Sequence, residues 1–384
     1  MRVSYGRQHI FPKDFISVNK ALNKNFLTQG KSVELFESKI KLFVNSKHAI
    51  VCNSGTSALH LAFLSIDVKK DDVILMPAIN FIAAFNMSVL LGARVYLVDV
   101  DPVNGQMSPD NLLKTVKQNK LKKIKAIVTM YLGGSPENVL SFYEIKKKLK
   151  CFLIEDACHA FGSKYIINKK NYKVGSCSHA DISTFSFHPL KTITTGEGGA
   201  VTTNNSKLAK NIAILRSHNL YRANKKIYWK YKAKGIGFNY RLSDLNCSLG
   251  ISQISSVNKI IKKRNIIAEE YKKKLKKFKD FIKIPDYSNK SKSCYHLMLI
   301  SIDFNKLSSN KDKFIKFMNK NNIYPQQHYI PLFKVSNIKY NIKNFSNTIK
   351  FFNNSVSLPI FYSLKNNQIE KVVKSIEKFI KQNK

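Results

Sequence analysis

From His48 to about Asn204 the sequence alternates short apolar runs with longer segments whose apolar residues have helical spacing. Seven of the short runs predict strands, namely HAIVC (48–52), DVILM (72–76), RVYLVDV (94–100), KAIVTM (125–130), CFLIE (151–155), DISTFSF (181–187) and GAVTT (199–203). Strands that alternate with helices favour an α/β domain built on a mainly parallel sheet. Ligands bind such sheets at the carboxyl ends of the strands, so the residues after each run are candidates for function.

The pattern changes after Arg241 and predicts a second unit of α+β type. A long amphipathic helical region over about 243–278 is followed by a strand candidate, CYHLMLISI (294–302). A helix over about 311–321 and a C-terminal helix from about Asn367 complete this part of the chain. The unit is therefore smaller than the first and is joined to it by the long helical region.

A chain of 384 residues is longer than a domain with a single simple core usually is, so we expect two domains. A hydrophobic share of 44% is ordinary for a globular protein, so a sizeable core can form. We expect a large ligand-binding domain over 12–245 and a small C-terminal domain over 246–384 that also includes residues 1–11.

The net charge of +41 comes from 58 lysines and only seven arginines. A basic excess can indicate nucleic-acid or anionic-membrane binding. Arginine is the preferred residue for bidentate recognition of phosphates and bases, and here it is scarce. The composition therefore favours a solvated lysine surface, with no nucleic-acid or membrane partner. A basic polyanion-binding protein remains the alternative from a different functional class.

The six cysteines form no C-x-x-C pair and show no metal-ligand spacing with histidine. They indicate reduced thiols in a cytoplasmic protein, and they predict no metal site. The N-terminus lacks a continuous apolar segment, and no run elsewhere approaches a membrane-spanning length. We therefore expect a cytoplasmic location.

A phosphate-binding turn is predicted directly after the first strand. Gly55, Thr56 and Ser57 stand there at the start of an apolar helix. A helix N-terminus offers free backbone N–H groups and a positive dipole end, and the two hydroxyls add donors. The alternative is an ordinary helix cap, because serine and threonine are favoured at that position in any helix.

Two further clusters follow later strands and suit a pyridoxal phosphate site. Asp156 ends an apolar run, and burying its carboxylate is costly unless a cation such as a protonated pyridine ring faces it. His159 stands about one helical turn later. Lys191 follows the DISTFSF run within a turn rich in glycine and hydroxyl groups, where desolvation favours covalent attachment of a carbonyl compound. Ser186 can add a hydroxyl to the phosphate. A capping aspartate, a core histidine and a surface lysine are the alternatives.

A fourth cluster, GIGFNYRLSDL (235–245), precedes the long helical region. Ser243 and Asp244 predict a helix start, and the whole run is compatible with a hinge between domains. Asn239 and Arg241 are not explained by capping.

At these motifs the sequence resembles the DegT/DnrJ family of sugar aminotransferases. That family has the aspartate-aminotransferase-like fold, which is fold type I of the pyridoxal-phosphate enzymes. The resemblance covers nearly the whole chain and rests on NSGTSALHLA (53–62), EDACHAFG (155–162), FSFHPLKTITTGEGGA (185–200), GFNYRLSDLN (237–246) and QHYIPL (327–332). It departs from the family at Asn80, where threonine is usual, and at Tyr131–Pro136, where His-Leu-Tyr-Gly-Gln-Pro is commoner.

The resemblance implies a role for each residue. Lys191 binds pyridoxal 5′-phosphate covalently and moves the proton, and Asp156 pairs with the pyridine nitrogen. The remaining cofactor contacts implied are Gly55, Thr56, Ser57, Phe81, His159, Ser186 and Asn239, of which Asn239 comes from the neighbouring subunit of a homodimer with shared active sites. The substrate contacts expected are His188, Arg241, His328 and Tyr329.

The implied reaction passes an amino group from L-glutamate to the C4 keto carbon of a UDP-linked 4-keto-6-deoxy-N-acetyl sugar, as in pathways of the pseudaminic acid type. No arginine follows Arg264, whereas amino-acid transaminases of this fold usually bind the substrate carboxylate with an arginine of the small domain. A sugar substrate is therefore favoured. Another nucleotide-sugar transaminase, acting on a 3-keto sugar or in a legionaminic-type pathway, is the alternative within the same fold.

Overall fold

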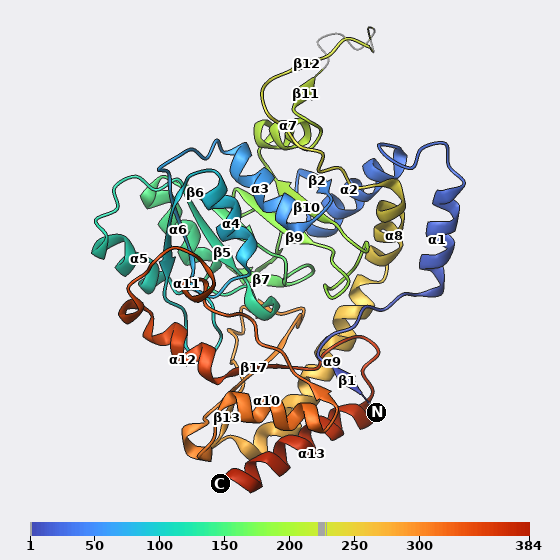
Figure 1. The fold of residues 1–384 in the computed structure, drawn as a ribbon. Helices are drawn as coiled ribbons and strands as arrows, with labels where there is room; N and C mark the ends of the chain where they lie inside the picture. The colour runs from blue at the N-terminus through green and yellow to red at the C-terminus, as the bar shows by residue number, and fades with distance from the viewer. Residues whose placement is uncertain (1, 222–226, 228) are drawn as a thin grey trace.

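The computed structural model describes residues 2–221, 227 and 229–384 (Figure 1). Its centre is a seven-stranded sheet with the strand order β2-β10-β9-β6-β5-β3-β4. These are the seven strands that the sequence predicts, namely β2 (His48–Cys52), β3 (Val73–Pro77), β4 (Arg94–Val98), β5 (Ala126–Met130), β6 (Phe152–Asp156), β9 (Ile182–Ser186) and β10 (Gly199–Thr203). Only β10 runs antiparallel to its neighbours β2 and β9. The predicted mainly parallel sheet is confirmed.

Helices cover both faces of this sheet because its strands alternate apolar side chains between the two faces. One face packs against α3 (Gly55–Ser65), α4 (Ile82–Leu90) and α7 (Ser206–Leu215). The other packs against α2 (Lys31–Val44), α5 (Pro109–Gln118) and α6 (Val139–Leu149). Helix α1 (Pro12–Leu22) lies on α8 (Asp244–Ile254) at the edge of this layer, and a short turn, η1 (Leu132–Gly134), follows β5.

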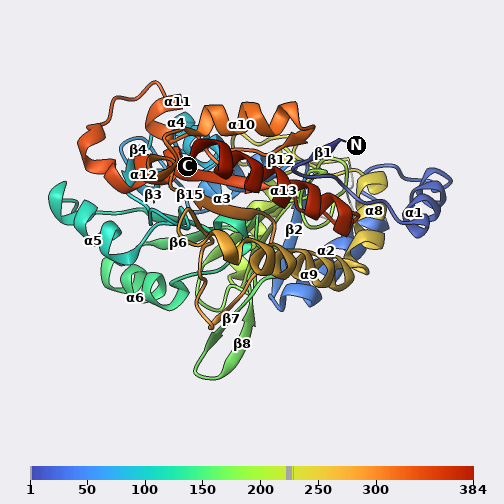
Figure 2. The ribbon, with the colours of Figure 1, turned by 90° about the horizontal axis from the view of Figure 1, so that it is seen from below.

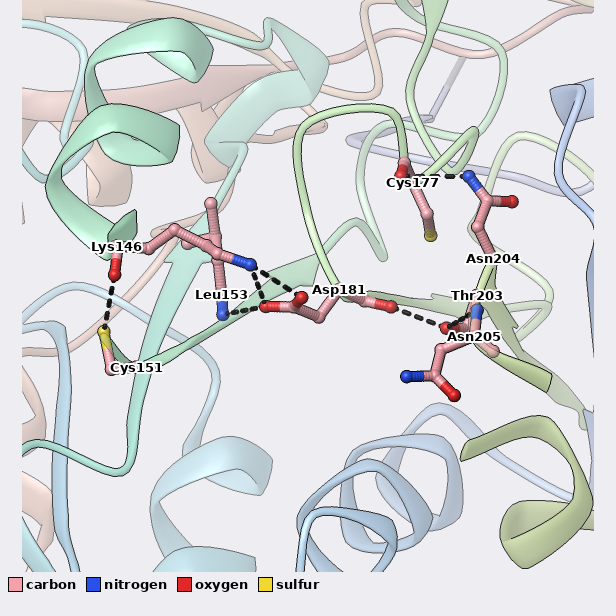
Figure 3. Close-up of polar contacts among 8 residues, drawn as sticks. All are labelled: Lys146, Cys151, Leu153, Cys177, Asp181, Thr203, Asn204 and Asn205. Carbon is pink, nitrogen blue, oxygen red and sulfur yellow. Dashed lines mark hydrogen bonds and ion pairs between the residues drawn. The ribbon is translucent and has the colours of Figure 1, made fainter. Parts of the chain in front are cut away.

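Asp181 connects three strands at the end of the sheet opposite the carboxyl ends of the parallel strands (Figure 3). Its carboxylate accepts hydrogen bonds from Lys146 Nζ at 2.6 and 2.7 Å and from the backbone N–H of Leu153 in β6 at 2.8 Å. Its carbonyl oxygen accepts a hydrogen bond from Thr203 Oγ1 in β10 at 2.7 Å. One residue just before β9 therefore fixes both neighbouring strands.

A second sheet of three antiparallel strands forms the C-terminal part, with β13 (Ile282–Lys283) and β17 (Ser355–Leu358) on either side of β15 (Met298–Ile302). Helices α9 (Val257–Leu275), α10 (Lys311–Lys320) and α13 (Asn366–Asn383) share its apolar core (Figures 1 and 2). The shorter elements are β1 (Val3–Ser4), β16 (Ile323–Tyr324), α11 (Leu332–Val335), α12 (Ser346–Asn354), η2 (Lys276–Phe278), η3 (Asn305–Leu307) and η4 (Ile342–Phe345). The domain limits of 12–245 and 246–384 stay a prediction.

The long helical region predicted over 243–278 is broken into two helices, α8 and α9, at Ser255 and Ser256. The hydroxyl of Ser255 donates to the carbonyl oxygen of Ser252 at 2.6 Å. The backbone N–H groups of Ser255 and Ser256 bond three residues back rather than four. A serine side chain that bonds to the local backbone competes with helix hydrogen bonds, and the Ser255 hydroxyl does so where α8 ends.

The strand predicted over 294–302 is shorter than expected, because β15 begins only at Met298. Tyr295 has φ +48°, a left-handed conformation that no regular strand tolerates. The residues before β15 therefore turn away from the sheet, and His296 among them lines the cavity described below.

Two hairpins extend from the main body and are absent from the sequence-based prediction. The first pairs β7 (Lys164–Ile167) with β8 (Lys170–Lys173) (Figure 2), and β14 (Ser291–Lys292) pairs with β7. Its turn residues Asn168 and Lys169 both have positive φ, as a tight hairpin turn requires. The second pairs β11 (Leu220–Tyr221) with β12 (Lys232–Ala233) and projects at the top of Figure 1.

Candidate active site

A cavity of about 460 Å³ lies at the carboxyl ends of the parallel strands β2, β6 and β9, where the sequence predicts the site. Helix α3 and the start of α4 form one side of it, and the segment between β16 and α11 forms the other. The structure brings most of the predicted site residues together around this cavity, namely Gly55, Thr56, Phe81, Asp156, His159, Ser186, His188, Lys191, His328 and Tyr329.

The first turn of α3 leaves backbone N–H groups free at the cavity. Ser54 caps the helix, and its hydroxyl oxygen accepts the N–H of Ser57 at 3.0 Å. The hydroxyl of Ser57 donates to Asn53 at 2.6 Å, so both polar groups of Ser57 are already engaged. The N–H groups of Gly55 and Thr56 precede the first helical hydrogen bond and are left for a ligand.

Gly55 is held against the end of β9 more closely than any other residue type permits. A Cβ atom at this position would lie 2.8 Å from Cβ of Ser186 and 3.4 Å from Sγ of Cys158. The glycine therefore lets the helix N-terminus approach Ser186. An anion bound here would meet backbone N–H groups, the helix dipole and two hydroxyls from Thr56 and Ser186.

Asp156 and Lys191 are the two desolvated charged groups of the cavity wall, which also includes Glu197. Asp156 ends β6 and is 3% exposed, and its carboxylate accepts a hydrogen bond from the N–H of Cys158 at 3.3 Å. Burial raises the pKa of Asp156, while the Cys158 hydrogen bonds and the charge of Lys191 oppose that rise. Burial lowers the pKa of Lys191, against the opposing effects of Cys158 and Asp156. Both groups are thus desolvated, and the attraction between their opposite charges favours the ionised form of each.

Three histidine rings are kept neutral near Lys191. Burial, followed by the charge of Lys191, lowers the pKa of His159 and His296 well below the usual value and that of His328 to about 3. The hydroxyl of Tyr329 lies 2.9 Å from Nε2 of His159, and Nδ1 of His328 lies 2.8 Å from the hydroxyl of Ser357. The wall opposite α3 therefore presents uncharged hydrogen-bonding groups.

Phe81 lies at the mouth of the cavity. It is the residue before α4, its side chain is 52% exposed, and its ring centroid is 5.7 Å from that of Tyr329. An exposed aromatic ring at a cavity mouth provides a flat apolar surface for a planar ligand.

Three predicted residues do not line this cavity in the described part of the chain, namely Ser57, Asn239 and Arg241. Asn239 is exposed and Arg241 is half-buried, both in the loop before α8. Among the described residues no arginine lines the cavity. The expected contacts of Asn239 and Arg241 with ligands, and that of Ser57 with the cofactor, stay predictions.

The two departures from the resembled family also lie off the cavity wall. Asn80 is 1% exposed, and its Oδ1 accepts the N–H of Phe81 at 2.7 Å. Tyr131 is 2% exposed and donates its hydroxyl hydrogen to Glu155 at 2.7 Å. Within the described chain, neither residue lines the cavity.

Sequence reasoning missed several residues of the wall, namely Tyr5, Cys158, Glu197 and His296. Cys158 and Glu197 lie inside motifs that the sequence analysis identified, so their position in those motifs could have predicted them. Tyr5 and His296 are distant in sequence from the motifs. The pairing of β1 with β16 carries Tyr5 to the cavity, and the left-handed turn at Tyr295 carries His296 there.

The described residues contain no group of three or more His, Cys, Asp or Glu side chains placed to hold a metal ion. In the same part of the chain, no helix has the length and apolar character needed to cross a membrane.

Comparison with known proteins connects this geometry with a family. The profile of the DegT/DnrJ/EryC1/StrS aminotransferase family matches residues 10–377. UDP-4-amino-4,6-dideoxy-N-acetyl-beta-L-altrosamine transaminase of Campylobacter jejuni is 36% identical over 361 residues, covering 93% of this chain and 92% of that protein. GDP-perosamine synthase of Escherichia coli O157:H7 is 29% identical and covers 94% of each chain.

Among solved structures, Helicobacter pylori PseC has a similar fold, with a TM-score of 0.89 and 29% identity over 100% of both chains. It is described as an aminotransferase involved in the biosynthesis of pseudoaminic acid. The aminotransferase fold predicted from the sequence is thereby confirmed.

Proposed function

Because the chain belongs to the DegT/DnrJ/EryC1/StrS aminotransferase family, we propose that it transfers an amino group from L-glutamate to the C4 keto carbon of a UDP-linked 4-keto-6-deoxy-N-acetyl sugar, with pyridoxal 5′-phosphate as its cofactor. The observation that carries the proposal is the shared cavity of Lys191 and Asp156 beside the N-terminus of α3. One amine, one buried carboxylate and one anion cradle are what this cofactor requires.

The residues present fit the cofactor at its phosphate and at its ring nitrogen. The close approach at Gly55 and the free N–H groups of α3 suit its phosphate. The carboxylate of Asp156 is buried and its pKa is raised by that burial in spite of its hydrogen bonds, so a cationic partner would offset the remaining cost. When bound, pyridoxal 5′-phosphate supplies a protonated ring that withdraws electrons from the substrate carbon that loses its proton.

Lys191 has the properties of a proton carrier at its Nζ atom. Its lowered pKa raises the fraction of neutral amine near neutral pH, and a neutral amine both attacks a carbonyl group and accepts a proton. The carboxylate of Asp156 would stabilise the positive charge of a protonated ring bound beside it. Phe81 and the rings of His159, His296 and His328 line the space around these two groups.

The sugar specificity of the proposal rests on the relatives. The name of the Campylobacter jejuni transaminase, at 36% identity, supports amination of a UDP-linked sugar at C4, and the Helicobacter pylori structure supports a pathway of the pseudaminic acid type. The cavity wall presents histidine and tyrosine side chains and, in the described chain, no arginine, which supports a sugar rather than a second carboxylate as the keto substrate. The similarity to GDP-perosamine synthase favours a second candidate, a transaminase for a different nucleotide sugar.

We further propose a homodimer in which Asn239 of one subunit reaches the site of the other. The exposed position of Asn239, off the cavity of its own chain, supports this arrangement. The six free cysteines support a reducing compartment such as the cytoplasm.

Substitution of the attachment residue tests the mechanism directly. Lys191→Ala should lose both the borohydride-reducible link to the cofactor and all transamination, because no other amine lines the cavity in the described chain. Lys207→Ala, at an exposed lysine of α7, should retain both. Turnover by the Lys191 variant at more than a trace would overturn the mechanism.

The substrate is tested by incubating the holoenzyme and L-glutamate with UDP-, GDP- and dTDP-linked keto sugars. NMR of the product reports which carbon carries the new nitrogen. Amination at C4 of the UDP sugar supports the proposal, whereas preference for a GDP sugar or amination at C3 supports the second candidate.

A further inference from the structure

Tyr329 and His159 form a pair in which one group must donate to the other. The hydroxyl oxygen of Tyr329 lies 2.9 Å from Nε2 of His159, and Tyr329 lines the cavity. The other ring nitrogen of His159, Nδ1, is buried without a hydrogen-bond partner among the described residues. The protonation state of His159 therefore decides where the Tyr329 hydrogen points.

The neutral His159 ring has two possible tautomers. If Nδ1 carries the hydrogen, the buried Nδ1–H group has no acceptor. The Tyr329 hydroxyl must then donate its hydrogen to Nε2. If Nε2 carries the ring hydrogen, His159 donates to the Tyr329 oxygen and only a lone pair is left unpaired. Unpaired buried N–H groups are rarer in proteins than unpaired acceptors, so we assign the hydrogen to Nε2. The Tyr329 hydrogen is then free for the cavity.

His296 lies beside His159 and also has a buried Nδ1 atom without a partner in the described chain. Its ring packs on that of His159 with 4.1 Å between centroids, and it is 6% exposed. The residue also lines the cavity. The same argument places its hydrogen on Nε2, which is the edge left to meet a ligand. The lowered pKa values of both histidines agree with neutral rings.

We propose that Tyr329 O–H and His296 Nε2–H form a neutral donor pair that binds an oxygen atom of the substrate, and that His159 is the positioning residue that turns the Tyr329 hydrogen toward it. The inference rests on the proposed function and deepens it by naming the ligand atom type, a carbonyl or hydroxyl oxygen. Uncharged donors suit such an oxygen, because a carboxylate or phosphate would be better matched by a cation.

The tautomers are measured by long-range ¹H–¹⁵N NMR of the holoenzyme with ¹⁵N-labelled histidine, at pH 7. His159→Gln and His296→Gln assign the two rings. Both rings should be neutral with the hydrogen on Nε2. A hydrogen on Nδ1 of His159, or a doubly protonated ring at either position, would overturn the inference. This readout requires no substrate, so it stands even if no sugar of the panel turns over and the proposed function fails.

Kinetics separate the donor from its positioning residue. With the panel sugar that turns over fastest, Tyr329→Phe should raise KM for the sugar about tenfold, the loss expected for one hydrogen bond. The half-reaction with glutamate should change little. Tyr340→Phe, which removes a hydroxyl bonded to Val95 away from the cavity, is the matched control and should leave KM unchanged. Unchanged KM in Tyr329→Phe would refute the donor role.

With pyridoxal 5′-phosphate kept saturating, since His159 is also an expected cofactor contact, His159→Gln should raise KM in the native background but add little to Tyr329→Phe, because His159 acts through the hydroxyl that this variant lacks. A purely structural role would make the two effects add. Circular dichroism and the melting temperature establish that each variant is folded.

Discussion

Gly55 is the residue at which packing and chemistry constrain each other most closely. Its hydrogen in place of a side chain lets the N-terminus of α3 lie against Ser186. The same approach creates the anion cradle, so any side chain at this position both strains the core and fills the cradle.

Gly55→Ala should weaken pyridoxal 5′-phosphate binding at least tenfold and lower the free energy of unfolding by about 1–3 kcal/mol, as overpacking does. Titration of the apoprotein with the cofactor, followed by absorbance, measures the first effect, and urea denaturation measures the second. Gly6→Ala is the control, because its nearest contact would be an ordinary 3.5 Å to Leu190. Unchanged cofactor affinity in Gly55→Ala would exclude the cradle.

His328 should make the stability of the protein depend on pH. Burial and the charge of Lys191 lower its folded pKa to about 3, whereas an unfolded histidine has a pKa of about 6.5. Between these values the unfolded chain binds a proton that the folded chain does not. The free energy of unfolding therefore falls as pH decreases below about 6.5.

Comparison with His328→Asn isolates this contribution. Asp156 and Glu155, whose pKa values are raised by burial, act in the opposite direction, but they are common to both proteins and cancel in the difference. The wild-type protein should lose about 2 kcal/mol more than the variant between pH 7 and pH 5. Urea denaturation at pH 7, 6 and 5 measures it, and parallel curves would contradict the prediction.

The residues of the site could be predicted where a motif surrounds them. Lys191 stands out among 58 lysines only because a strand precedes it and a glycine-rich turn follows it. His296 and Tyr5 have no such local context. Their place at the cavity depends on a backbone turn at Tyr295 and on the pairing of two-residue strands, and neither leaves a clear pattern in a single sequence.

At the scale of elements, the seven strands of the central sheet were predicted because each is a buried apolar run bounded by polar residues. The hairpin of β7 and β8 was missed because its strands are lysine-rich and partly exposed. The break between α8 and α9 was missed because the apolar helical spacing continues across it. The hydrogen bond of the Ser255 hydroxyl and the three-residue backbone bonds of Ser255 and Ser256 are local geometry that periodicity does not report.

Asp181 should contribute to stability through the strands that it connects rather than through its charge alone. Asp181→Ala leaves the Lys146 ammonium and the Leu153 N–H without their partner, which should lower the free energy of unfolding by about 2–3 kcal/mol. Glu269→Ala removes an exposed pair with Lys272 and should cost less than about 0.5 kcal/mol. Urea denaturation of both variants measures the contrast, and equal effects would contradict it.

At the scale of the whole molecule, the proposed exchange of Asn239 between subunits predicts complementation. Lys191→Ala and Asn239→Ala should each be poorly active as homodimers. In a hybrid dimer, one site would carry both substitutions and the other neither, so co-expression of the two variants should restore up to about one quarter of wild-type activity.

Light scattering establishes the dimer, and differently tagged subunits allow the hybrid to be purified. Activity of the hybrid no greater than that of the two homodimers would show that Asn239 serves its own chain.

The short strand β1 at the beginning of the chain has a practical consequence. It lies beside β16, and the carbonyl oxygen of the next residue, Tyr5, accepts a hydrogen bond from Ile360 while the side chain lines the cavity. A purification tag fused ahead of β1 would lie only a few residues from Tyr5 in the wall of the active-site cavity. A tag after Lys384 would extend α13, which in the described chain contributes nothing to that wall. Recombinant versions meant for assays should therefore be tagged at the carboxyl end.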